Sequence, residues 1–124
     1  MALDKNTVLA KTNAKEIVLA CVKALNAEDF TAARKHVSDD FTFEGVLGSR
    51  NGAEDYFKDM SKMKLKYDVK KSFVDGDDVC LFYDLAMSGL TIFGCGWYRV
   101  GGDKIKSLKV VFDPRPVLEQ SGKK

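Results

Sequence analysis

Residues 79–100, VCLFYDLAMSGLTIFGCGWYRV, predict the centre of a β-sheet. Two largely apolar runs, 79–87 and 91–100, are separated by the turn signal Ser88-Gly89. A turn this short joins antiparallel neighbours. Both runs are apolar on both faces, so we expect helices to cover one face of the sheet. A second copy of the chain is the simplest cover for the other face, and a monomer with wide apolar strands is the alternative.

The flanking sequence predicts helices before this sheet and further strands on either side of it. At the start of each expected helix, an asparagine stands three residues before an acidic residue, and apolar residues follow at helical spacing. The expected helices lie near 13–25, 27–37 and 52–62. Alternating residues predict the remaining strands, which are 41–44, 65–73 and 104–113. This order of elements indicates an α+β domain in which helices cover one face of a curved antiparallel sheet.

Composition limits the classes of function. A chain of 124 residues suits a single domain. Its 20 basic and 18 acidic residues give a net charge of +2, which disfavours a nucleic-acid partner. No apolar run approaches the roughly 20 residues of a membrane span, and the first residues lack a signal-peptide pattern. Three widely spaced cysteines and a single histidine favour reduced thiols in the cytoplasm and no metal site.

Three stretches carry a resemblance to a known family. They are ALNAEDF (24–30), SDDFTFEGVLGSRNGAEDYF (38–57) and YRVGGDKIKSLKVVFDP (98–114). On these, the chain resembles the nuclear-transport-factor-2-like superfamily, in its SnoaL-like and ketosteroid-isomerase-like branch. The resemblance implies one domain spanning 1–124, with a core at about 13–114. It also implies a cystatin-like, cone-shaped barrel, with three N-terminal helices on the concave face of the sheet and a deep pocket between them.

The same resemblance argues against the steroid isomerase mechanism. In that branch, a catalytic aspartate follows the glutamate of the strand that here reads DDFTFEG, and its position falls on Gly45. The positions of the family's tyrosine and protonated-aspartate donors fall on Cys21 and Gly96. That mechanism needs a carboxylate base and donors for the developing oxyanion, and glycine supplies neither. Members of the superfamily include isomerases, cyclases, dehydratases, hydrolases and non-catalytic binders, so the fold leaves the activity open.

Asp84 and His36 are the candidates for catalysis. Asp84 shares the even-numbered face of its strand with Cys80 and Phe82, and the resemblance places that face toward the pocket. A carboxyl group among apolar side chains has a raised pKa and can act as a general acid or base. A pairing of Asp84 with a backbone group, an arginine or a second copy is the alternative. His36, the only histidine, could shuttle a proton or donate to a ligand, or it could simply cap or pack.

The expected pocket is mostly apolar, with a few polar groups that could bind a ligand oxygen. Alternate glycines in strand 91–100 leave space above the sheet for a ligand or a bulky side chain, or they mark a bulge. We expect a small hydrophobic ligand and no cofactor, with cofactor-independent proton transfer if the protein is an enzyme. A non-catalytic dimeric binding or interaction module is the alternative. The predicted ligand-binding residues are Cys21, Phe43, Gly45, Tyr56, Met60, Phe82, Gly96, Tyr98, Val110 and Phe112.

Overall fold

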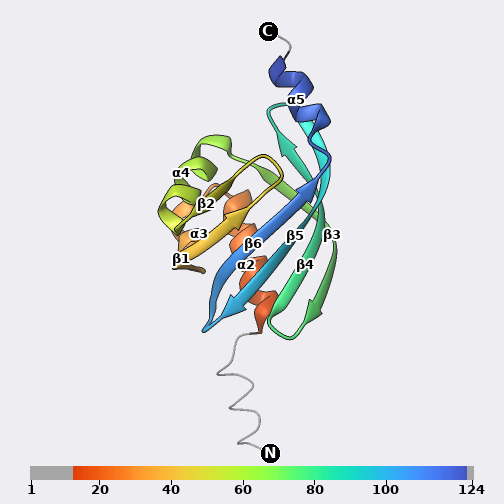
Figure 1. Ribbon diagram of the computed structural model, residues 1–124. Coiled ribbons are helices and arrows are strands. Elements are labelled where there is room, and N and C mark those ends of the chain that lie inside the picture. The colour runs from red at the N-terminus through yellow and green to blue at the C-terminus, as the bar shows by residue number, and fades with distance from the viewer. Residues whose placement is uncertain (1–12, 123–124) are drawn as a thin grey trace, which may run out of the picture.

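The computed structural model describes residues 13–122, which form a six-stranded sheet with four helices (Figure 1). The strands run in the order β2-β1-β6-β5-β4-β3. Neighbouring strands are antiparallel except β1 and β6, which are parallel. The strands are β1 (Val37–Glu44), β2 (Ser49–Asn51), β3 (Lys66–Asp75), β4 (Asp78–Met87), β5 (Leu90–Gly101) and β6 (Lys104–Phe112). The helices are α2 (Ala14–Asn26), α3 (Phe30–Arg34), α4 (Ala53–Met63) and α5 (Arg115–Gly122).

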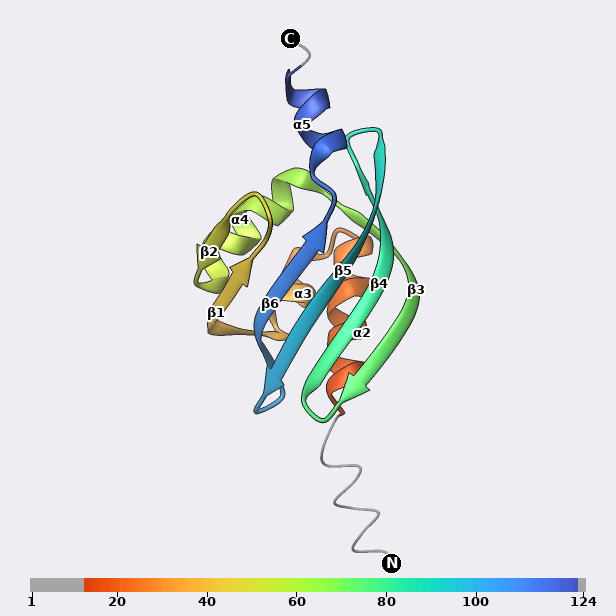
Figure 2. The ribbon, with the colours of Figure 1, turned by 45° about the vertical axis from the view of Figure 1, so that its right-hand side comes forward.

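The predicted α+β class is confirmed, with two differences in detail. Figure 2 shows α2 and α3 against one face of the curved sheet, with α4 beside β1 and β2. The fourth helix, α5, was not predicted, and it extends beyond the end of the sheet (Figure 2). The sheet is also not wholly antiparallel, since β1 and β6 are parallel, a pairing that the long crossover between them permits.

The helix starts agree only partly with the expected asparagine caps. Asn13 caps α2, and its side chain accepts a hydrogen bond of 2.8 Å from the Glu16 amide. Asn26 caps no helix and instead binds the Tyr67 backbone through both its amide nitrogen and its oxygen, at 2.9 and 2.7 Å. Asp29 caps α3 in its place, so the second helix is shorter than 27–37. The Asn26 side chain therefore fixes the end of α2 against β3.

The register between β4 and β5 determines which side chains face the helices. Leu81 pairs with Gly96 and Tyr83 with Gly94, and these four residues are buried. Directly paired residues share one face of a sheet. The concave face therefore carries the odd-numbered residues of β4 and the even-numbered residues of β5. The core forms where this face meets α2, and its largest fully buried side chains are Tyr83, Phe41, Leu81, Ile105, Val18 and Val79.

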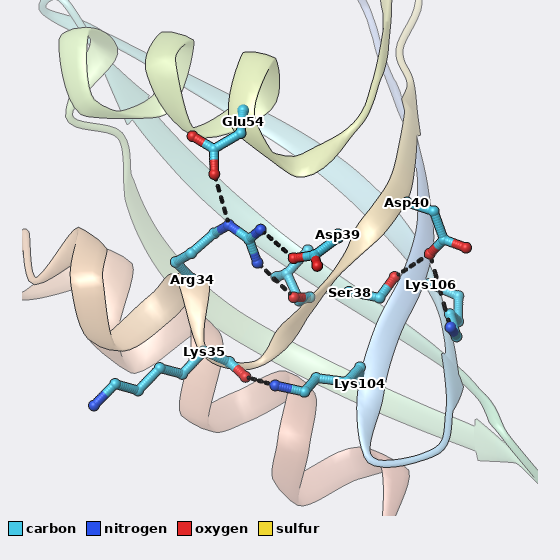
Figure 3. Close-up of polar contacts among 9 residues, drawn as sticks. Arg34, Lys35, Ser38, Asp39, Asp40, Glu54, Lys104 and Lys106 are labelled. Atoms are coloured by element: carbon cyan, nitrogen blue, oxygen red, sulfur yellow. Dashed lines mark hydrogen bonds and ion pairs between the residues drawn. The ribbon is translucent and has the colours of Figure 1, made fainter.

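Arg34 links three elements at the end of α3 (Figure 3). Its terminal nitrogens donate to the Val37 carbonyl at 2.8 Å and to Asp39 Oδ1 at 2.6 Å. Its buried Nε lies 3.6 Å from Glu54 Oε2, beyond hydrogen-bond distance. The guanidinium thus holds together the end of α3, the start of β1 and the first turn of α4.

Replacing Arg34 by alanine is expected to lower the free energy of unfolding by about 1–3 kcal/mol, because the Val37 carbonyl and the Asp39 carboxylate lose their donor and Glu54 loses its ion pair. Urea titration followed by the fluorescence of Trp97, the only tryptophan, measures this change. Lys70→Ala is the control, since Lys70 forms exposed ion pairs with Asp68 and Asp84. That change should cost less than about 0.5 kcal/mol. Equal losses in the two variants would contradict a structural role for Arg34.

Candidate functional site

A cavity of about 320 Å³ lies between the concave face of the sheet, α4 and the turn that joins β1 to β2. Its walls are mostly apolar, and Val117 of α5 also lines it. Six of the predicted ligand-binding residues do line this cavity. They are Phe43, Gly45, Tyr56, Met60, Val110 and Phe112.

Three tyrosines supply polar groups to this apolar cavity. Tyr56 comes from α4, Tyr67 from β3 and Tyr83 from β4. The rings of Tyr67 and Tyr83 meet edge to face, with their centroids 5.1 Å apart. Burial raises the pKa of all three phenols above their ordinary value. The hydroxyls therefore stay protonated at neutral pH and keep their capacity to donate a hydrogen bond.

Tyr83 occupies the space that alternate glycines leave on β5. A Cβ atom on Gly94 would lie 3.7 Å from Tyr83 Cε1, and one on Gly96 would lie 3.0 Å from the Tyr83 hydroxyl. The glycines therefore admit an aromatic side chain of the neighbouring strand. Gly96 does not line the cavity, so its predicted role as part of an open pocket floor is not supported.

Cys21 and Tyr98 lie in the core and do not line the cavity. The Cys21 thiol is 3.6 Å from the Ala33 carbonyl oxygen, to which it donates a hydrogen bond. Burial raises the pKa of this thiol to about 12, so it remains protonated and is a poor nucleophile. Tyr98 is 4% exposed, and burial raises the pKa of its phenol.

Asp84 and Phe82 lie on the convex face of the sheet, away from the cavity. The expectation that even-numbered residues of β4 face the pocket is wrong, because the odd-numbered residues pack against the helices. Asp84 Oδ2 lies 3.7 Å from Lys70 Nζ, in a partly exposed ion pair. Phe82 stacks on Phe93 with ring centroids 6.1 Å apart. These positions leave neither residue available to a ligand in the cavity.

His36 is also outside the cavity, so the structure does not bring it to a shared site with Asp84. It is partly buried in the turn between α3 and β1, and its carbonyl accepts a hydrogen bond of 2.8 Å from the Ile105 amide. Through this bond its backbone helps to join the start of β1 to β6.

Two charged residues at the cavity mouth were missed by sequence reasoning. Arg50 of β2 and Asp59 of α4 both line the cavity, and Arg50 Nε donates to Asp59 Oδ2 at 2.7 Å. Beside them, the exposed residues Val46 and Leu47 form the turn between β1 and β2. No sequence motif connects Arg50 with Asp59. Arg50 falls between the expected strand 41–44 and the expected helix 52–62, and Asp59 falls within that helix.

Within residues 13–122, no group of three or more histidine, cysteine or acidic side chains could hold a metal ion. Nor does this part of the chain contain a helix long and apolar enough to cross a membrane.

Comparison with known proteins identifies the family. The model of the SnoaL-like domain family matches residues 18–108, and the chain belongs to this family. A crystal structure of an NTF2-like protein of unknown function from Cytophaga hutchinsonii is 47% identical, with a TM-score of 0.85, and the match covers 87% of this chain and 96% of that one. The search of curated proteins found no match.

Two enzymes share the fold at low sequence identity. An LEH-like epoxide hydrolase from M. tuberculosis is 23% identical, with a TM-score of 0.71, and the match covers 86% of each chain. The epoxide hydrolase/cyclase-like enzyme SalBIII, described for pyran ring formation in the polyether salinomycin, is 20% identical with a TM-score of 0.72. That match covers 81% of this chain and 90% of SalBIII. At these identities, the likeness shows the fold alone.

Replacing Gly96 by alanine is expected to destabilise the protein by about 1–3 kcal/mol, because the new methyl group would crowd Tyr83, Tyr98 and Leu108. Thermal or urea unfolding measures the change. Gly48→Ala is the matched control, since a Cβ atom there meets nothing within 4 Å. If Gly96→Ala is as stable as Gly48→Ala, Tyr83 does not fill the space above Gly96 as described.

Proposed function

We propose that this protein binds a small, largely apolar organic molecule in the cavity, and that the tyrosine hydroxyls bind an oxygen of that molecule. The observation that supports this is the combination of apolar walls with Tyr56, Tyr67 and Tyr83. Few polar groups in an otherwise apolar cavity are typical of small-molecule sites. The volume of about 320 Å³ suits a ligand of one or two rings.

The chemistry that the cavity could support is the polarisation of a carbonyl or hydroxyl oxygen. Protonated phenols that donate to an oxygen stabilise negative charge developing on it, which favours proton transfer at a neighbouring carbon. Among residues 13–122, Asp59 is the only carboxylate that lines the cavity, and it is paired with Arg50. An oxygen-bearing organic ligand is consistent with the two enzymes that share the fold, an epoxide hydrolase and an epoxide hydrolase/cyclase-like enzyme.

Two neutral probes test this proposal, 2-acetylnaphthalene and 2-ethylnaphthalene. They differ only in that the acetyl group has a carbonyl oxygen where the ethyl group has two hydrogens. Calorimetric titration should show that both bind and that the acetyl compound binds about 2–10-fold tighter, because it gains one hydrogen bond. Val110→Trp should abolish binding of both probes by filling the cavity. Val111→Trp is the control. Val111 is next to Val110 in the chain, but it is 61% exposed and does not line the cavity.

Tyrosine variants then test the polar part of the proposal. At least one of Tyr56→Phe, Tyr67→Phe and Tyr83→Phe should remove the preference for the acetyl compound without weakening the binding of 2-ethylnaphthalene. Binding that persists in Val110→Trp would contradict the cavity as the site. A preference that survives all three substitutions would contradict oxygen binding by the phenols.

We also propose that the convex face of the sheet joins two copies of the chain. This face leaves large apolar side chains in solvent, with Phe93 59% exposed and Val111 61% exposed. Phe73 and Trp97 extend the same surface across β3 and β5.

The charges on this convex face are of both signs, because Arg99 pairs with Asp78 and Lys109 with Glu44. A mixed, nearly neutral surface of this kind can complement itself across a twofold axis. An alternative function as a dimeric interaction module depends on this face.

Light scattering should therefore give about twice the chain mass of 13.8 kDa for the unmodified protein. Phe93→Glu should give the mass of one chain, because it places a desolvated charge in the apolar contact. Leu118→Glu is the control, since Leu118 is similarly exposed at 53% but lies on α5. A monomeric unmodified protein, or a dimer that both variants retain, would contradict this interface.

A further inference from the structure

In the part of the chain that the structure describes, Arg50 and Asp59 are the only charged side chains that line the cavity. They come from different elements, the edge strand β2 and the helix α4. The Arg50 side chain is 46% exposed and that of Asp59 is 35% exposed, so both are accessible from solvent. An ion pair placed where an apolar cavity opens would be in contact with any ligand that enters.

The guanidinium of Arg50 is held in place but is not saturated. Nε donates to Asp59 Oδ2 at 2.7 Å, and Nη1 donates to the Ser49 carbonyl at 2.8 Å. A guanidinium carries five N–H groups in a planar fork. The other three, on Nη1 and Nη2, donate no hydrogen bond to residues 13–122. Arg50 therefore presents several directed donors and a positive charge, while Asp59 fixes their orientation.

We propose that the ligand is amphipathic and carries a carboxylate, which Arg50 binds at the mouth while the apolar body fills the cavity. This inference rests on the proposed function, because it assumes that the cavity is the ligand site. Arginine suits this role because its fork matches the two oxygens of a carboxylate. Asp59 acts as a positioning residue and does not contact the apolar body of the ligand.

The ion pair could instead select a cation through Asp59. One Asp59 oxygen already accepts the Arg50 Nε–H, whereas three N–H groups of Arg50 donate to none of the described residues. The ion pair therefore offers a ligand mainly hydrogen-bond donors, and these favour an anionic ligand. An ammonium ligand would also have to approach the guanidinium, whose charge repels it.

Three naphthalene probes with different side groups test the inference by calorimetric titration at pH 7 and low salt. They are 2-naphthoate, which is anionic, naphthalene-2-carboxamide, which is neutral and of similar shape, and 2-naphthylmethylamine, which is cationic. The naphthoate is expected to bind about tenfold or more tightly than the carboxamide, since a hydrogen bond between charged groups is stronger. Raising the salt concentration should reduce this preference, because Arg50 is partly exposed.

Substitutions at Arg50 assign the preference to this side chain. Arg50→Gln should weaken naphthoate binding to about the level of the carboxamide, with a much smaller effect on the carboxamide itself, whereas Arg50→Lys should retain part of the preference. Arg99→Gln is the matched control, because Arg99 is also a strand arginine whose Nε pairs with an aspartate, Asp78, at 3.1 Å. Arg99 is exposed and does not line the cavity, so its substitution should leave the preference intact.

The outcomes separate this inference from the proposed function. Equal binding of naphthoate and carboxamide, a preference for the amine, or a naphthoate preference that survives Arg50→Gln would each overturn the carboxylate assignment. If the charged probes fail to bind while 2-acetylnaphthalene binds, the inference fails and the proposed function stands. If 2-acetylnaphthalene also fails to bind, the cavity is not a site for ligands of this kind, and both fail.

Discussion

The register between β4 and β5 is the constraint on which the cavity depends. It places Tyr83 opposite Gly94 and next to Gly96, so that one aromatic ring fills the space left by two missing side chains. A slip of one residue would expose Leu81, Tyr83 and Leu85 and turn Asp84 toward the core. Exposing three such side chains would cost about 5–9 kcal/mol, which is comparable with the whole stability of a typical domain. The packing of α2 against the sheet therefore favours the observed register.

Much of the architecture could be predicted from local sequence patterns. The turn at Ser88-Gly89 has positive φ values at both residues, as short turns between antiparallel strands require, and it was visible as a turn signal. The Asn13 cap was also readable, since it depends only on residues three positions apart. Asn26 had the same local spacing but binds the Tyr67 backbone, 41 residues away. A contact at that distance overrides a local capping preference and leaves no local signal.

The faces of the central strands could not be assigned from the sequence, and this led to the wrong placement of Asp84. Alternation identifies the buried face only when one face is polar, and residues 79–87 are apolar on both. Both sets of side chains have a hydrophobic environment: the odd-numbered set faces the helices, and the even-numbered set includes Phe82, which packs against Phe73 and Phe93. Asp84 is accommodated on the convex face because Lys70 neighbours it there. The resemblance to a known family gave the fold but placed the wrong face of this strand toward the pocket.

The polar groups of the site fall into two sets. One set is the three tyrosines Tyr56, Tyr67 and Tyr83, here called the floor, and the other is the ion pair of Arg50 and Asp59 at the mouth. The floor carries phenols that burial keeps protonated, so they can donate to an oxygen but cannot remove a proton at neutral pH. The mouth carries a guanidinium whose orientation is fixed by an ion pair with a carboxylate. A molecule that satisfies both regions would need an oxygen at its inner end and an acceptor at its outer end, separated by an apolar body. Sequence could not reveal this arrangement, because Arg50 and Asp59 meet only when α4 packs beside β2. In the sheet, β2 is separated by three strands from β4, which carries Tyr83.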